Sequence, residues 1–82
     1  MFEIEFTRAA EKQLLKLDAQ VQTRILTALE RIRIRPQAYV RKLVGVQGYR
    51  LRVGDWRVIV DIETARVVIL VLEIGRRENI YA

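Results

Sequence analysis

The sequence has 82 residues and contains neither cysteine nor histidine. Without cysteine the chain forms no disulfide bonds and no metal site built on thiolates. Without histidine it lacks the side chain that most often binds transition metals and moves protons near neutral pH. The carboxylates Asp55, Asp61, Glu63 and Glu73 are scattered along the chain, so we expect no metal and no other cofactor. Any catalysis must rest on arginine, lysine, tyrosine, hydroxyl or carboxylate groups.

The sequence also has no apolar run that could cross a bilayer. The longest run, residues 67–72, is far below the roughly 20 residues that a membrane-spanning helix needs. The first residues, MFEIEF, carry acidic side chains where a signal peptide has basic ones. We therefore expect a cytoplasmic protein with no membrane association.

The composition is that of one small folded domain. Hydrophobic residues make up 51% of the chain and charged residues 30%, which favours folding over disorder. We expect a single domain over residues 1–82. A core of this size is marginal without help from a partner.

The charge is strongly basic, with a net charge of +5 and a pI of about 10.2. Twelve of the fifteen basic residues are arginine, whose planar group suits phosphate. One interpretation is a solvated basic surface, and the other is a polyanionic partner, most simply nucleic acid. An acidic protein partner is compatible with both.

Hydrophobic periodicity predicts the order βααβββ. Alternation and helical spacing, with Thr7 and Asp18 as N-caps and Pro36 as a breaker, predict the following segments: a strand at 2–6, a helix at 8–17, a second helix ending near 33, a loop at 35–48, and strands at 49–53, 56–62 and 67–74. We expect an α+β fold in which a helical hairpin packs on a mainly antiparallel sheet of four strands. The last strand is apolar on both faces, so the face away from the helices needs cover from the chain ends or a partner.

The segment QGYRLRVGDWRVIV predicts a hairpin whose two-residue turn is Gly54-Asp55. That register pairs Arg52 with Arg57 and puts Arg50 on the same face. Like charges placed opposite each other are unfavourable. One interpretation is that Asp55 or Asp61 neutralises these arginines, or that their side chains extend into water. The other is that a bound phosphate relieves the repulsion.

The C-terminal segment GRRENIYA adds Arg76, Arg77 and Tyr81 beyond the last strand. Tyr81 is either a core aromatic or, next to a basic surface, a group that stacks on a base or moves a proton.

These motifs, taken in order, resemble the RelE/ParE superfamily of type II toxins. The resemblance covers KLVG at 42–45, YRLR at 49–52, GDWRV at 54–58 and GRRENIY at 75–81, and the opening FTRAAEKQLLKL also fits it. It implies a RelE-like fold. In the RelE branch it implies a small endoribonuclease that cuts mRNA in the ribosomal A site and is inhibited by its antitoxin. ParE-like members share the fold and poison DNA gyrase instead.

The resemblance also implies the site residues. Carried over by position, the family's functional residues fall on Arg50, Arg52, Arg57, Arg77 and Tyr81. We expect Arg52, Arg57, Arg77 and Tyr81 to be catalytic, and Arg50, Arg76 and Lys42 to bind the substrate. Some RelE members have lysine at the positions of Arg50 and Arg52. Because arginine hardly loses its proton, Tyr81 becomes the candidate general base, while Arg57 and Arg77 stabilise the phosphate.

The implied partners are the ribosome with its mRNA and a cognate RelB-like antitoxin, an acidic, amphipathic helix that forms a hetero-oligomer with the toxin. Two other interpretations remain open. One is a ParE-like gyrase poison without a nuclease site, and the other is a toxin-fold module with neither activity.

Overall fold

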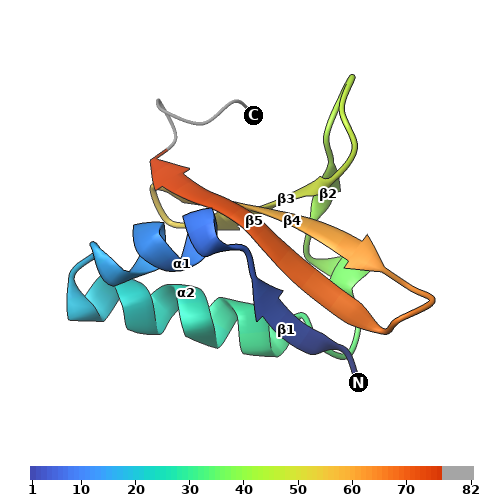
Figure 1. Ribbon diagram of the computed structural model, residues 1–82, viewed down its shortest axis with the longest axis horizontal. Helices are drawn as coiled ribbons and strands as arrows, with labels where there is room; N and C mark the ends of the chain where they lie inside the picture. The colour runs from blue at the N-terminus through green and yellow to red at the C-terminus, as the bar shows by residue number, and fades with distance from the viewer. Residues whose placement is uncertain (77–82) are drawn as a thin grey trace.

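A mixed sheet of five strands carries two helices on one of its faces (Figure 1). The computed structural model describes residues 1–76. In chain order the elements are β1 (Glu3–Phe6), α1 (Arg8–Leu15), α2 (Ala19–Arg31), the 3-10 helix η1 (Pro36–Ala38), β2 (Arg41–Lys42), β3 (Tyr49–Val53), β4 (Trp56–Glu63) and β5 (Val68–Arg76). The expected α+β class and the order of the helices and long strands are confirmed. Neither helix of residues 1–76 is long and apolar enough to span a membrane.

The strands lie side by side in the order β1-β5-β4-β3-β2. β1 runs parallel to β5 and the other neighbours are antiparallel, so the sheet is mainly antiparallel as predicted. The strand count differs from the predicted four because β2 forms within 35–48, which the sequence predicts as a loop. Its two residues, Arg41 and Lys42, pair with Arg50 and Tyr49 of β3. A two-residue charged segment shows no alternation, so only its pairing reveals it.

Both helices begin where their predicted caps stand. The Thr7 hydroxyl accepts a hydrogen bond from the Ala10 amide at 3.1 Å and donates one to the Leu72 carbonyl at 3.1 Å. This residue therefore caps α1 and ties it to β5. Asp18 precedes α2 but makes no side-chain cap hydrogen bond. Each helix ends two residues before the predicted end, at Leu15 and Arg31.

The core lies between the helices and the sheet face beneath them. The predicted helical stripes supply Ala10 and Leu14 from α1 and Ile25 and Leu29 from α2, with Ile32 directly after it, all buried. They pack on the buried residues of the three long strands, which are Leu51, Val53, Val58, Val60, Ile69, Val71 and Ile74. This confirms that the stripes are core.

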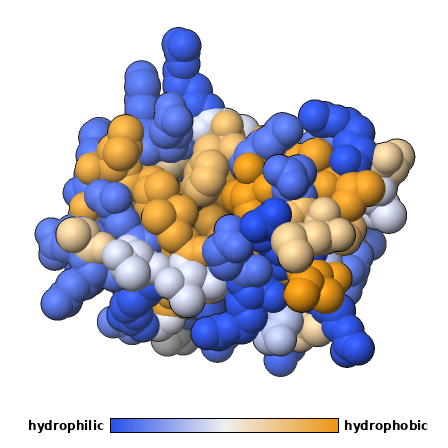
Figure 2. All heavy atoms as spheres, turned by 90° about the horizontal axis from the view of Figure 1, so that it is seen from below, coloured by the Kyte–Doolittle hydropathy of each residue, from blue (hydrophilic) through white to orange (hydrophobic). Residues whose placement is uncertain are grey.

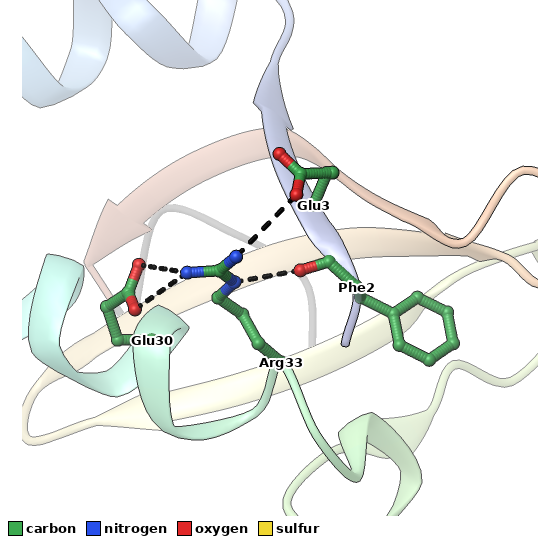
Figure 3. A network of polar contacts seen from close by, with 4 residues as sticks. All are labelled: Phe2, Glu3, Glu30 and Arg33. Atoms are coloured by element: carbon green, nitrogen blue, oxygen red, sulfur yellow. Dashed lines mark hydrogen bonds and ion pairs between the residues drawn. The ribbon is translucent and has the colours of Figure 1, made fainter.

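Arg33, just after α2, fastens the helical hairpin to the N-terminal strand (Figure 3). Its Nε donates to the Phe2 carbonyl at 2.8 Å, and the Phe2 amide donates to the Arg33 carbonyl at 2.8 Å. The same guanidinium lies 2.9 Å from the Glu30 carboxylate and 3.7 Å from that of Glu3. Two segments thirty residues apart are thus held together at the edge of the sheet.

The sheet face that points away from the helices is called the open face below, and it carries Arg50, Arg52, Arg57, Ile59 and Glu73. A bulge between Ile59 and Val60 interrupts the β4–β5 register. Leu43, which follows β2, packs here against Ile59 and Leu72. Part of the cover that the apolar last strand requires therefore comes from this loop. The C-terminal end, one predicted source of cover, lies outside the described residues.

The turn between β4 and β5 contains a β-branched residue in the left-handed region, since Val67 has φ +57°. That conformation costs an L-residue about 1–2 kcal/mol, whereas glycine adopts it freely. Val67 is 42% exposed, so little burial is lost on its removal. We expect Val67→Gly to stabilise the protein by about 0.5–1 kcal/mol and to raise Tm by about 4 °C in thermal unfolding followed by circular dichroism.

Ala65→Gly in the same turn is the matched control. Ala65 has a negative φ, so this substitution only adds freedom to the unfolded chain and should lower Tm. Equal decreases in both variants would show that the turn stores no strain at Val67.

Candidate nucleic-acid interface

The arginine hairpin forms with the predicted register. Arg52 pairs with Arg57, Arg50 with Ile59, and Leu51 with Val58. Gly54 has φ +61° while Asp55 does not have a positive φ, which is the pattern of a type II′ turn. The turn chemistry and the alternation thus place three arginines on the open face.

Arg57 is buried, with 3% of its surface exposed. Its Nη1 donates to the Gly54 carbonyl at 3.2 Å and to the Trp56 carbonyl at 3.0 Å. These two carbonyl groups hold the guanidinium in one orientation next to the hairpin turn. The sequence predicts the position of this arginine but not its burial, because burial depends on the strands on either side.

The neutralising role that the sequence leaves open for Asp55 and Asp61 is not seen toward Arg50 or Arg52. Within residues 1–76, the ion pairs involve Arg33 and Arg66 instead. The Asp61 carboxylate accepts a hydrogen bond from the Ile62 amide. The positive charge of Arg50 and Arg52 is therefore not balanced by the hairpin's own acids.

Arg50 lies in a cross-strand row that the sequence does not reveal. The row runs from Arg41 through Arg50 and Ile59 to Glu73. Arg50 is half-buried, and its Nε, buried from solvent, has no hydrogen-bond partner in the described part of the chain. An unsatisfied buried donor is costly, and an anion bound at the open face would satisfy it.

Arg41, and not the predicted Lys42, lies on the open face. Because side chains alternate along a strand, Arg41 shares the face of Arg50 and the predicted Lys42 points the other way, opposite Tyr49. Lys42 lines a separate cavity of about 490 Å³ with Gly48, Tyr49 and Asp61. Arg41 was missed because β2 leaves no pattern in the sequence. A role of Lys42 in substrate binding stays a prediction.

Arg76 is engaged away from the other arginines. It pairs with Trp56 across the β4–β5 ladder, and its guanidinium lies 5.4 Å above the Trp56 ring, a cation–π contact. Trp56 packs against the helix-side core, so Arg76 does not join the open face. Arg57 is paired instead with Gly75, which has no side chain. Arg77 and Tyr81, two of the four predicted catalytic residues, lie outside the described residues.

The arginines of the open face are suited to binding a phosphate group. Fixed guanidinium groups donate hydrogen bonds and positive charge, which suits a phosphodiester and the extra negative charge of its transition state. In the described part of the chain, no group of three or more acidic, histidine or cysteine side chains could hold a metal ion. The geometry thus fits binding and electrostatic stabilisation of a phosphate.

A family model described as the ParE toxin of the type II toxin–antitoxin system parDE matches residues 4–81. Since this match covers nearly the whole chain, the chain belongs to this family of type II toxins, which confirms the resemblance to the RelE/ParE superfamily. A search among curated proteins gives no significant match.

Solved structures of RelE toxins share the fold. The toxin in the intact E. coli RelBE toxin–antitoxin complex is 25% identical, with a TM-score of 0.81 over 96% of this chain and 100% of that one. The archaeal RelE–RelB complex from Pyrococcus horikoshii gives 26% identity and 0.78, covering 96% and 98%. RelBE2 from Mycobacterium tuberculosis, at 19% identity and 0.85 over 93% and 98%, shows similarity of fold alone.

Proposed function

We propose that this toxin is a metal-independent endoribonuclease that cuts mRNA in the A site of the translating ribosome. The observation that carries the proposal is the hairpin register, which sets Arg50, Arg52 and the buried Arg57 on one face. Within residues 1–76, no acidic side chain forms an ion pair with Arg50 or Arg52. The RelE toxins among the similar structures support this branch. Its site of action would be the cytoplasm, where ribosomes translate.

In the proposed reaction the 2′-hydroxyl of RNA attacks the adjacent phosphorus and the bond to the 5′ oxygen breaks. Tyr81 takes the proton of the 2′-hydroxyl, and Arg57 and Arg77 stabilise the charge on the pentacoordinate phosphate. Arg50 binds the backbone at the open face, and a role of Arg76 in substrate binding stays a prediction. Arg52 donates a hydrogen bond to the leaving 5′ oxygen, which takes up a proton from water. The products are a 2′,3′-cyclic phosphate and a 5′-hydroxyl end.

Tyrosine and arginine side chains are poorly matched to proton transfer near neutral pH. Such a site gains most from a ribosome that holds the RNA in a reactive geometry, because positioning alone supplies a large part of the rate. The proposal therefore includes dependence on the ribosome.

We also propose a cognate antitoxin with an acidic, amphipathic segment, since the E. coli and P. horikoshii relatives are found in RelE–RelB complexes. Seen from the side of α2, the surface shows hydrophobic residues between hydrophilic ones (Figure 2). Exposed apolar residues of the two helices include Leu15 and Leu26. A segment with apolar and acidic faces would cover both kinds of surface.

The test is to add the purified toxin to a cell-free translation reaction and to map the ends of the mRNA. We expect cuts clustered in the A-site codon, absent without ribosomes, with cyclic phosphate ends. Arg77→Ala and Tyr81→Ala should each slow cleavage about a hundredfold or more, as loss of a charge contact or a general base does.

The second candidate is a ParE-like gyrase poison, which the description of the matching family model favours. Intact mRNA with continued translation, together with inhibition of gyrase in a DNA supercoiling assay, would replace the nuclease proposal with this one. Products with a 3′-hydroxyl end would contradict the proposed chemistry even if RNA were cut.

A further inference from the structure

A second basic site lies on the helix side of the hairpin. A groove of about 320 Å³ separates α2 from the end of β3, with Arg24, Thr27 and Arg31 on the helix and Arg52, Val53 and Gly54 on the hairpin. Three arginines and a hydroxyl line it, and the lining contains no acidic residue. It therefore offers several hydrogen-bond donors and a concentrated positive charge.

The two helix arginines are arranged along one side of the groove. Arg24 and Arg31 are seven residues apart, which is two helical turns and a rise of about 10 Å. Both are exposed, and the ion pairs formed within residues 1–76 belong to Arg33 and Arg66. Their charges are thus available to an extended anion lying along α2.

Gly54 lets the groove close on the hairpin turn. A Cβ built on this residue would lie 2.5 Å from Nη2 of Arg24, so the guanidinium rests on the bare backbone of the turn. The requirement for glycine at this position comes from its φ of +61°. Arg24 and Arg52 therefore line the same groove, although the two residues are far apart in the sequence.

The groove and the open face share Arg52. Arg52 lines the groove and also pairs with Arg57 across the hairpin. β2 pairs only with Tyr49 and Arg50, so beyond Arg50 no described strand covers the outer edge of β3. A chain could pass from the open face over this edge into the groove.

We propose that the groove between α2 and the hairpin binds the phosphodiester backbone of RNA, as a second site beside the open face. Guanidinium groups in a row along an extended groove match successive phosphates, and each can donate two parallel hydrogen bonds. The backbone could be that of the mRNA or of ribosomal RNA. The inference rests on the proposed function, since it assumes an RNA target.

The test compares the full-length toxin with Arg24→Gln/Arg31→Gln and with a control of equal charge, Lys12→Gln/Lys16→Gln. The control lysines are exposed residues of α1 and its C-terminal cap, and α1 lies over β5 while α2 contacts β3. One arm measures binding to a single-stranded 2′-O-methyl RNA 15-mer, which 2′-hydroxyl attack cannot cut. The other measures sedimentation with salt-washed ribosomes that carry no mRNA.

We expect the groove variant to bind about tenfold more weakly near 0.15 M salt. Its plot of log affinity against log salt should be flatter by about 1.4, the value for two lost phosphate contacts on a single strand. The control should change much less. A loss with the 15-mer alone assigns the groove to the mRNA, and a loss with ribosomes alone assigns it to ribosomal RNA. Either outcome supports the inference.

Unchanged binding in both arms would overturn the inference. A third measurement uses a glutamate-rich 20-residue peptide. If the groove variant loses binding to this peptide alone, the groove binds an acidic protein segment and not RNA. These interpretations require that the Arg24→Gln/Arg31→Gln variant has the melting temperature of the wild type. We expect this because both arginines are exposed. If wild type cuts the A-site codon while the groove variant binds like wild type, only the groove proposal fails. If wild type does not cut while the variant loses RNA binding, only the nuclease proposal fails.

Discussion

Replacing Arg57 with lysine is expected to slow A-site cleavage about a hundredfold, the usual cost of removing one fixed contact to a charged transition state. Lysine keeps the charge but cannot donate to the carbonyls of Gly54 and Trp56 while presenting a planar group to the phosphate. The measurement is the single-turnover rate of mRNA cleavage with the toxin in excess over programmed ribosomes. Because two hydrogen bonds are affected, a stability loss of about 1–2 kcal/mol should accompany it.

Arg66→Lys is the matched control for this prediction. Arg66 lies in the turn at the opposite end of β4, where it contacts Glu63 and Glu5. The hydrogen bond to Glu63, followed by the charges of Glu63 and Glu5, raises the pKa of Arg66, and the lysine variant keeps the positive charge. We expect wild-type cleavage from it. If Arg57→Lys cleaves at the wild-type rate and only its Tm falls, Arg57 serves the fold alone.

Replacing Ile25 with alanine is expected to remove much of the stability of the free toxin. Ile25 has 0% exposure and belongs to the core cluster under α2. Such truncations cost about 2–5 kcal/mol, through lost burial and the cavity left behind. A chain of this length has a total stability of about 4–12 kcal/mol. Urea unfolding followed by circular dichroism should show a much lower midpoint.

The neighbouring residue supplies the control. Leu26 is on the same helix but 42% exposed, so Leu26→Ala should cost well under half as much as Ile25→Ala. Similar losses at both positions would mean that α2 does not rest on the sheet through the face described here.

The hairpin shows how far local patterns reach. Alternation in 49–53 and 56–62 and the Gly54-Asp55 turn were enough to predict the pairing of Arg52 with Arg57. Turn geometry and the two-residue period are set by neighbours in the chain, so they can be read without the rest of the molecule. The apolar stripes of α1 and α2 were predictable for the same reason.

Features that depend on contacts between distant segments were not predicted. β2 exists only because Arg41 and Lys42 meet β3, and this pairing adds Arg41 to the open face in place of Lys42. The cation–π contact likewise takes Arg76 to the other side of the sheet. In each case a strand register or a packing partner decides which way a side chain points.

The sequence by itself determined that this protein has no thiol or imidazole chemistry, that it is strongly basic, and that its helices and long strands follow the order βααβββ. Only the tertiary structure decided that Arg57 is buried and held by the turn, and that Arg24 meets Gly54 to form a basic groove. Composition and periodicity are properties of neighbouring residues. The burial and direction of a side chain depend on residues that only folding brings near.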